Sequence, residues 1–279
     1  MILYTYINIK TGGRMDLGLE NSVALITGGS VGIGLAVAKE FLAEKAGVII
    51  CARDEERLNN VVTELKTAYP GAKVYGKRCD VSKPEDIESL VAYIKSLGGV
   101  DILINNAGTG SEEKIMTAPD EKWYHYWDLH VMSALRLTRA LVPIMKERPG
   151  EGVIINVTSI CATQPLYYEP IYNVTKAALN MLTKCMAAEF AGYNIRALAI
   201  APGLVLTPDW YKTAGILSKQ EGITVQQYFD RIAGDMTPLG RYASPEEVAK
   251  TFVFLASKQS SYTLGTSIDV DAGAKRTLT

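Results

Sequence analysis

The chain has 279 residues, of which 48% are hydrophobic, and its formal net charge is −1. This length suits one large α/β domain or two small ones, with a substantial buried core. The near-neutral charge gives no electrostatic reason to expect nucleic acid or an anionic membrane as a partner, and no apolar run approaches the roughly 20 residues that a membrane-spanning helix needs.

The four cysteines form no C-x-x-C pair; they are Cys51, Cys79, Cys161 and Cys185. Because His125 and His130 are the only histidines, we expect no metal site. Three of the cysteines lie in apolar or strand-like surroundings, which is typical of small core residues in a reducing compartment and favours a cytoplasmic location. Residues 1–14 lack the basic start and the apolar run of a signal peptide, so we expect a dispensable N-terminal extension.

Apolar, β-branched runs that predict buried strands alternate with stretches that predict helices. In chain order we expect strand 22–27, helix 32–44, strand 47–52, helix 55–68, strand 73–78, helix 84–97, strand 100–105, helix 121–146, strand 152–158, helix 172–191, strand 195–201, helix 245–256 and strand 266–270. Ser82 is a candidate N-cap before Pro84, and Ser244 with Glu247 makes a capping-box pattern. This alternation predicts a parallel sheet of about seven strands with helices on both faces, a doubly wound Rossmann-type α/β fold in a single domain over residues 15–279.

The first predicted strand runs directly into the turn Thr27-Gly28-Gly29-Ser30-Val31-Gly32-Ile33-Gly34, and a helix follows at once. In this context a glycine pattern indicates a nucleotide site rather than a turn that only closes a βα unit. Gly28 permits the tight turn, Gly32 lets the backbone approach a phosphate, and Gly34 lets the helix pack close to the strand. The helix N-terminus then offers free N–H groups and a positive dipole end to a pyrophosphate.

Tyr172 stands four positions before Lys176, and Ser159 stands thirteen positions before Tyr172. A phenol has an ordinary pKa of about 10, and a lysine one helical turn away lies on the same face of a helix and favours the phenolate. A hydroxyl from a separate strand end would hold a carbonyl or alcohol oxygen against that phenol. The three residues therefore predict a proton-transfer device for interconverting an alcohol and a ketone.

Together these motifs resemble the short-chain dehydrogenase/reductase family over about residues 19–273. Besides the T-G-x-x-x-G-I-G turn, the matching elements are Asn105-Asn106-Ala107-Gly108 for its N-N-A-G element, Asp80-Val81 for its adenine-contacting pair, Pro202-Gly203-Leu204-Val205-Leu206-Thr207 for its P-G-x-V-x-T segment at the nicotinamide carboxamide, and Ser159, Tyr172 and Lys176 for its catalytic residues. The resemblance implies hydride transfer between a nicotinamide and a carbonyl carbon, with Tyr172 giving the proton. It also implies that Ser159 orients the oxygen, and that Lys176 lowers the tyrosine pKa and bonds the nicotinamide ribose.

The end of the second strand bears on the choice of cofactor. Ala52 stands where family members that prefer NAD usually carry an aspartate, and the Arg53 that follows can meet a 2′-phosphate, so we expect NADP(H). NAD(H) stays open as an alternative, because Val31 stands where many NADP-binding relatives have a second basic residue and Asp54 adds negative charge. Arg53 would then be a solvated charge at a helix start.

The resemblance further implies an asparagine in the long helix, seven residues after a tryptophan and fifteen before a methionine. Counting from Trp123 and from Met145 places His130 there instead. One hypothesis is that His130 replaces the asparagine in a proton relay and adds a pH dependence, because histidine titrates near pH 6.5. The other is that His130 fills the space and bonds backbone at a helix irregularity.

Two stretches, 161–169 and 206–236, are expected to wall the substrate pocket, and the second, a long insertion, is expected to act as a lid. Their aromatic and aliphatic residues suit a mid-sized, partly apolar carbonyl or secondary alcohol as the small-molecule partner. The resemblance implies a homotetramer or homodimer that pairs through the helices 121–146 and 172–191.

The leading interpretation is an oxidoreductase that prefers NADP(H) and interconverts a carbonyl and a secondary alcohol. Two alternatives stay open. One is an NAD-linked sugar or polyol dehydrogenase of the same family. The other is a nucleotide-binding regulator without turnover, against which the intact Ser159, Tyr172 and Lys176 argue.

Overall fold

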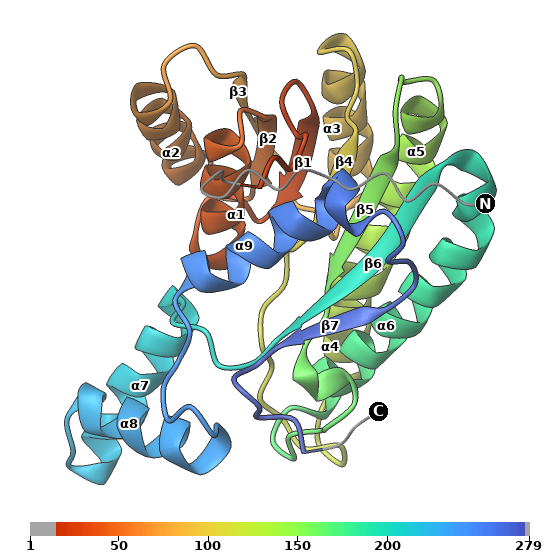
Figure 1. Cartoon of the computed structure of the whole chain (residues 1–279). Helices are drawn as coiled ribbons and strands as arrows, with labels where there is room; N and C mark the ends of the chain where they lie inside the picture. Colours follow the sequence, from red (N-terminus) through yellow and green to blue (C-terminus); the bar gives the residue numbers. More distant parts are fainter. Residues whose placement is uncertain (1–14, 277–279) are drawn as a thin grey trace, which may run out of the picture.

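The computed structural model describes residues 15–276, so the predicted extension over residues 1–14 lies outside the described part of the chain. The described residues form a seven-stranded parallel sheet in the order β3-β2-β1-β4-β5-β6-β7 (Figure 1). Its strands are β1 Val23–Thr27, β2 Gly47–Ala52, β3 Val74–Arg78, β4 Ile102–Asn105, β5 Gly152–Val157, β6 Ile195–Pro202 and β7 Ser267–Val270. The chain crosses from β3 at one edge back to β4 beside β1, and this reversal confirms the predicted doubly wound Rossmann-type fold.

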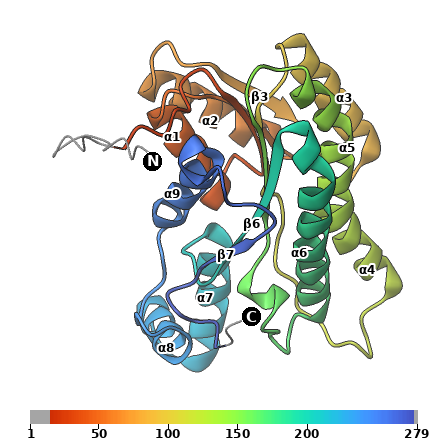
Figure 2. The same ribbon diagram turned by 45° about the vertical axis from the view of Figure 1, so that its right-hand side comes forward.

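Helices alternate with these strands and cover both faces of the sheet. They are α1 Gly32–Ala43, α2 Glu55–Ala68, α3 Pro84–Ser96, α4 Asp120–Trp127, α5 Ser133–Lys146, α6 Pro170–Phe190, α7 Pro208–Glu221, α8 Val225–Met236 and α9 Pro245–Ala256. Helices α1, α2 and α9 pack on one face, and α3, α5 and α6 pack on the other (Figure 2). Among the described residues, no helix is long and apolar enough to cross a membrane.

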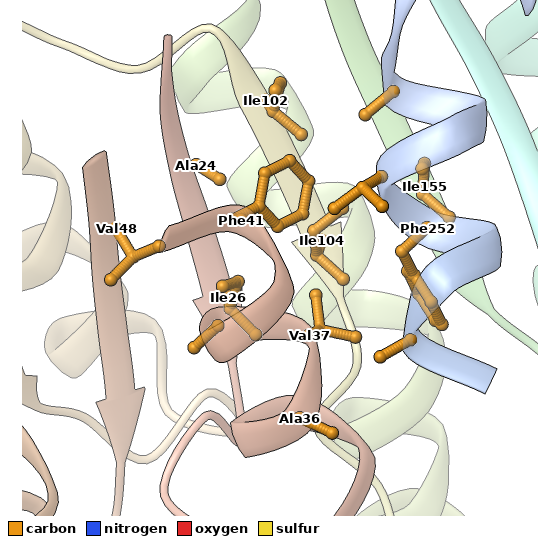
Figure 3. Close-up of a cluster of buried hydrophobic side chains, with 14 of the residues drawn as sticks. Ala24, Ile26, Ala36, Val37, Phe41, Val48, Ile102, Ile104, Ile155 and Phe252 are labelled. Atoms are coloured by element: carbon orange, nitrogen blue, oxygen red, sulfur yellow. The ribbon is translucent and has the colours of Figure 1, made fainter. Parts of the chain in front are cut away.

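The strands of the sheet are buried on both faces, as expected for a parallel sheet between helices. Along β1, Ile26 faces the cluster under α1 and α9, whereas Leu25 faces the cluster under α3 and α5. Phe41 of α1 and Phe252 of α9 are fully buried in the same cluster as Ile26 and Ile104 (Figure 3). Truncating either ring to alanine would cost about 3–5 kcal/mol, so this packing fixes α1 firmly behind the glycine turn.

The helix predicted over residues 121–146 is interrupted. Helix α4 passes into a π-helical turn, Asp128–Met132, before α5 begins. Ser133 Oγ bonds back to the carbonyl oxygen of Leu129 at 2.6 Å, a side-chain contact that competes with the regular ladder. Such π-helical turns often mark functional sites, and His130 lies in the middle of this one.

One of the two predicted helix starts is wrong. Lys83, not Ser82, is the N-cap of α3, and it makes no side-chain cap bond. The Ser82 hydroxyl instead donates to Asp80 Oδ1 at 2.7 Å, because the neighbouring carboxylate is the stronger acceptor. The predicted capping box of Ser244 and Glu247 at the start of α9 is confirmed.

The segment predicted as a lid, 206–236, contains the helices α7 and α8. Their apolar side chains form a small cluster of their own, which includes Ala214, Tyr228 and Phe229. Trp210 packs edge-on against Tyr242, with ring centroids 5.3 Å apart. Helices α7 and α8 project beyond the sheet at the end of β6 (Figure 1). They are therefore held to the body of the protein more lightly than the helices on the two faces.

Candidate active site

The ends of β1 and β4 are locked together at the carboxyl edge of the sheet. Thr27 Oγ1 accepts hydrogen bonds from the backbone N–H groups of Asn106 and Ala107, each at 2.9 Å. The Asn106 amide in turn donates to the carbonyl oxygen of Thr27 at 2.8 Å. The glycine turn and the N-N-A-G element therefore sit side by side, as two walls of a nucleotide cleft require.

The glycine turn has the backbone that its sequence predicts. Gly28 and Gly32 have φ values of 65° and 57°, in the left-handed region that favours glycine. A Cβ on Gly34 would lie 2.4 Å from the carbonyl oxygen of Gly28, so only glycine fits there. Val31 is the N-cap of α1 and makes no side-chain cap bond, so the first N–H groups of the helix are left to a phosphate. The other predicted residues of the turn are Ser30, which is buried, and Ile33, which is partly buried.

Charged residues of both signs follow the end of β2 in the structure. Arg53 is exposed directly after the strand. Hydrogen bonds from Arg57 hold the pKa of the Asp54 carboxyl below its ordinary value, because Asp54 caps α2 and pairs with that guanidinium. Asp54 was expected to disfavour a 2′-phosphate because of its negative charge. In the structure that charge is compensated by Arg57. Asp80 and the buried Val81 follow β3 at the neighbouring strand end.

The P-G-x-V-x-T segment leaves β6 at Pro202. A Cβ on Gly203 would lie 2.8 Å from Asp271 Cα, so glycine is needed where the C-terminal segment passes. The buried Val205 is held by a bridge to Ala243. Thr207 is the N-cap of α7 without a side-chain cap bond, and a Cβ on Gly32 would lie 3.5 Å from its methyl group. The Thr207 side chain therefore faces the glycine turn across the cleft.

The structure brings Ser159, Tyr172 and Lys176 into one cluster beyond the end of β5. Ser159 Oγ accepts a hydrogen bond from Cys161 N at 3.2 Å, and the hydroxyl is also hydrogen-bonded to the Tyr172 phenol. Lys176 Nζ donates to the carbonyl oxygen of Val157 at 2.7 Å and lies 5.4 Å from the centroid of the Tyr172 ring. This arrangement places a hydroxyl, a phenol and an ammonium group around one point.

Burial dominates the charge states of this cluster. It raises the pKa of the Tyr172 phenol well above its ordinary value, and the hydrogen bond from Ser159 offsets this only in part. Burial also lowers the pKa of Lys176 to about 8. That Lys176 lowers the Tyr172 pKa stays a prediction of the family resemblance. The resting phenol is neutral and is therefore a proton donor.

His130 contacts the cluster from the π-helical turn and is only 2% exposed. Its Nδ1 lies 2.8 Å from Thr175 Oγ1, and that hydroxyl donates to the carbonyl oxygen of Tyr172 at 3.1 Å. Because the hydroxyl proton is used in this way, Nδ1 carries the imidazole proton, and Nε2 faces Thr109 N at 3.4 Å. A Cβ on Gly108 would lie 3.1 Å from His130 Nε2, so glycine leaves room for the ring.

The sequence did not single out one acid that lies beside Tyr172. Glu169 is 8% exposed, and burial raises the pKa of its carboxyl to about 7. Cys161 Sγ donates to its Oε1 at 3.4 Å, and its charge in turn raises the Tyr172 pKa. Glu169 is an acid in the wall segment 161–169, three positions before Tyr172. This position is the signal in the sequence by which Glu169 could have been found. Among the described residues, no group of His, Cys, Asp and Glu side chains could hold a metal ion.

Comparison with known proteins places these features in context. A family model described as enoyl-(acyl carrier protein) reductase matches residues 28–275. The structure of L-sorbose reductase from Gluconobacter frateurii, complexed with NADPH and L-sorbose, is 50% identical over 95% of this chain and 100% of that chain, with a TM-score of 0.92.

Two further relatives are more distant. An NADPH-bound short chain oxidoreductase from Pseudomonas aeruginosa, described as containing an atypical catalytic center, is 34% identical over 92% of this chain and 97% of that chain, with a TM-score of 0.84. A 3α-hydroxysteroid dehydrogenase from Mediterraneibacter gnavus is 34% identical over 265 residues, which cover 94% of this chain and all of that protein.

Proposed function

The chain belongs to the short-chain dehydrogenase/reductase family, and from this premise we propose that it is an NADP(H)-dependent reductase of polyhydroxylated ketones, with Tyr172 as the proton donor. It is an oxidoreductase that acts on CH–OH groups with NAD(P). The cofactor preference, the proton donor and the substrate class form the proposal. The observation that carries it is a neutral, partly buried phenol held by Ser159 beside the Lys176 ammonium, at the edge where the glycine turn opens.

The residues of the cluster divide the work of carbonyl reduction. The hydride for the carbonyl carbon would come from NADPH held in the cleft beside the glycine turn. The Tyr172 phenol gives its proton to the carbonyl oxygen, and the Ser159 hydroxyl holds the same oxygen in place. Lys176, whose pKa is about 8, is largely protonated at neutral pH and stabilises the negative charge left on the phenol. Alcohol oxidation runs through the same contacts in reverse.

The preference for NADP(H) rests on the charge at the end of β2. Arg53 is exposed next to the cleft, and Arg57 compensates Asp54. Arg53 would meet a 2′-phosphate there, and charge-assisted hydrogen bonds from arginine are among the stronger polar contacts. The relatives from Gluconobacter frateurii and Pseudomonas aeruginosa, both described with NADPH, support the same choice.

The substrate class rests on Glu169. A carboxyl group is costly to bury without hydrogen-bond partners, and within residues 15–276 the one partner of the Glu169 carboxyl is the weak thiol donor of Cys161 at 3.4 Å. Hydroxyl groups of a polyhydroxylated ketone would supply the missing donors beside Tyr172. A steroid or a small apolar ketone would leave the Glu169 carboxyl without these hydrogen bonds. The L-sorbose bound to the 50% identical relative supports a substrate of this kind.

Initial-rate measurements with NADPH and NADH test the proposal against a panel of ketoses, a steroid ketone and a small apolar ketone. We expect turnover of ketoses with NADPH, slower turnover with NADH, and little turnover of the other ketones. Tyr172→Phe should lower kcat about 100-fold or more, because general-acid catalysis contributes at least that much. Tyr262→Phe is the control, since this tyrosine is fully exposed and lies outside the segments that wall the pocket. Wild-type turnover by Tyr172→Phe would overturn the role of Tyr172.

A further inference from the structure

The helix that carries Tyr172 begins without a cap of its own. Glu169 occupies the N-cap position of α6 but makes no side-chain cap bond, and Pro170 at the first helical position has no N–H. The first bond of the ladder runs from Asn173 N to the carbonyl oxygen of Glu169 at 3.0 Å. The N–H groups of Ile171 and Tyr172 are therefore left without partners inside the helix.

A loop that follows the N-N-A-G element supplies both acceptors. Glu113 Oε1 accepts from Ile171 N at 2.9 Å, and Ser111 Oγ accepts from Tyr172 N at 3.2 Å. The Ser111 hydroxyl donates in turn to Glu113 Oε1 at 3.0 Å, so the two side chains act as a unit. Lys122 Nζ lies 2.9 Å from Glu113 Oε2. The nearly buried carboxylate thus faces both an ammonium group and the positive end of the α6 dipole, which compensate its loss of water.

We propose that Ser111 and Glu113 are positioning residues that set the direction of the Tyr172 phenol by capping α6 from outside the helix. The residue at the N-cap position cannot do so, because the Glu169 side chain turns to Cys161 in the candidate substrate pocket. The bond from Tyr172 N to Ser111 Oγ fixes the backbone of the proton donor itself. This inference rests on the proposed role of Tyr172.

The loop is suited to this task because it is anchored on two sides. Tyr126 Oη donates to the carbonyl oxygen of Gly110 at 2.7 Å, which ties the loop to α4. Glu113 N donates to the carbonyl oxygen of Tyr168 at 3.0 Å, which ties it to the segment before α6. A shift of the loop would therefore move the start of α6, and a misplacement of about 1 Å can cost a reaction about 100-fold in rate.

Steady-state kinetics of Ser111→Ala, Glu113→Ala and Glu113→Gln test the inference, with Glu112→Ala as the matched control. Glu112 is exposed, and only its backbone oxygen contacts Lys122. Wild-type turnover and its loss in Tyr172→Phe are established first, so that a failure of the proposed function is seen separately. NADPH affinity, by fluorescence titration, and the melting temperature are measured for every variant.

We expect Ser111→Ala and Glu113→Ala to lower kcat about tenfold or more, with the KM for NADPH unchanged. Glu113→Gln keeps an acceptor oxygen for Ile171 N and should restore most of the rate, and the double alanine variant should be no slower than Glu113→Ala. Unchanged kcat in both alanine variants would overturn the inference. A rate loss matched by a fall in melting temperature and in NADPH affinity would also overturn it, because the cap would then serve folding alone.

Discussion

At the scale of single residues, His130 differs from the expected asparagine mainly in that it could carry a charge. Burial, and next the nearby positive charge of Lys176, lower the pKa of its imidazole to about 2. The ring is therefore neutral at any pH at which the enzyme would work. Of the two hypotheses for His130, a relay is then confined to hydrogen bonding by the neutral ring. The shortest hydrogen bond of the His130 ring is to the Thr175 side chain, which in turn bonds the backbone of Tyr172. The ring does not have its shortest bond to the backbone at the helix irregularity.

A neutral buried histidine changes how stability depends on pH. Below about pH 6.5 the unfolded chain binds a proton at His130, whereas the folded protein does not until about pH 2. The unfolded state therefore binds more protons, and stability falls as the pH is lowered. We expect wild type to lose about 2 kcal/mol more than His130→Asn between about pH 7.5 and pH 5, as measured by urea unfolding.

Gln259→Ala provides the control, because this exposed residue lies away from His130 and its substitution should leave the pH dependence at the wild-type value. An equal loss of stability in wild type and in His130→Asn would show that the imidazole is protonated in the folded protein. The relay with an added pH dependence would then be restored as a hypothesis.

The sequence pointed to Ser159, Tyr172 and Lys176 because their spacing within one strand end and one helix turn is a local property. Ser111 and Glu113 gave no such signal. Their partners are backbone N–H groups 61 and 58 positions away, and a backbone donor has no residue type to recognise. Contacts of this kind follow from how loops meet in space.

At the scale of elements, predicted and observed boundaries agree closely, except where irregular hydrogen bonding intervenes. The π-helical turn Asp128–Met132 keeps the helical spacing of apolar residues on either side, so periodicity cannot reveal it. The helices α7 and α8 were expected only as an insertion, because they pack mainly on each other. The apolar faces of α7 and α8 therefore point toward each other and not toward the main core of the domain.

The C-terminal segment 271–276 is an element that the sequence did not connect with the site. Gln164 Nε2 donates to the carbonyl oxygen of Ala274 at 3.2 Å, and Gln164 Oε1 accepts from Arg276 N at 2.7 Å. This paired contact seats the buried Ala274 against Ile160 and Cys161. The segment thus supports the wall of the candidate substrate pocket from behind.

We expect Gln164→Ala to raise the KM for the ketose about tenfold while the affinity for NADPH stays the same. Two hydrogen bonds of about 1 kcal/mol each hold the segment against the wall, and without them the wall is free to move. Substrate-dependent kinetics and NADPH titration measure the two effects. Gln259→Ala, which removes a comparable bond to Asp16 away from the site, is the control. A rise in the NADPH dissociation constant alone would contradict this view of the segment.

At the scale of the whole molecule, the layered architecture follows from the alternation of buried strands and amphipathic helices. The strand order could be expected only through the family resemblance, because periodicity does not state which strands are neighbours. The structure adds an exposed apolar face on α4 and α6. It contains Tyr124 and Trp127 one turn apart on α4, and Val174 and Met181 two turns apart on α6. Helices α4 and α6 pack against each other, and we propose that these side chains form one apolar patch.

An exposed apolar patch of this kind commonly marks a protein–protein interface, and most soluble oligomers are symmetric homo-oligomers. The patch lies on two helices that the family resemblance implies as the pairing surface, so we propose that the protein forms a homodimer or homotetramer through it. Met181 is 66% exposed and Val174 is 47% exposed, and pairing would bury both. The melting temperature should then rise with protein concentration, because association stabilises the folded state by mass action.

A charge placed on this face should separate the subunits. We expect Met181→Glu to convert the assembly into smaller species in light scattering coupled to size-exclusion chromatography, because two carboxylates would be desolvated across a symmetric interface. Met116→Glu adds the same charge at a side chain that is 92% exposed in a loop before α4, and it should leave the assembly intact. A wild-type protein that is monomeric at every concentration tested would refute the interface. A Met181→Glu variant of unchanged mass would place the interface on another face.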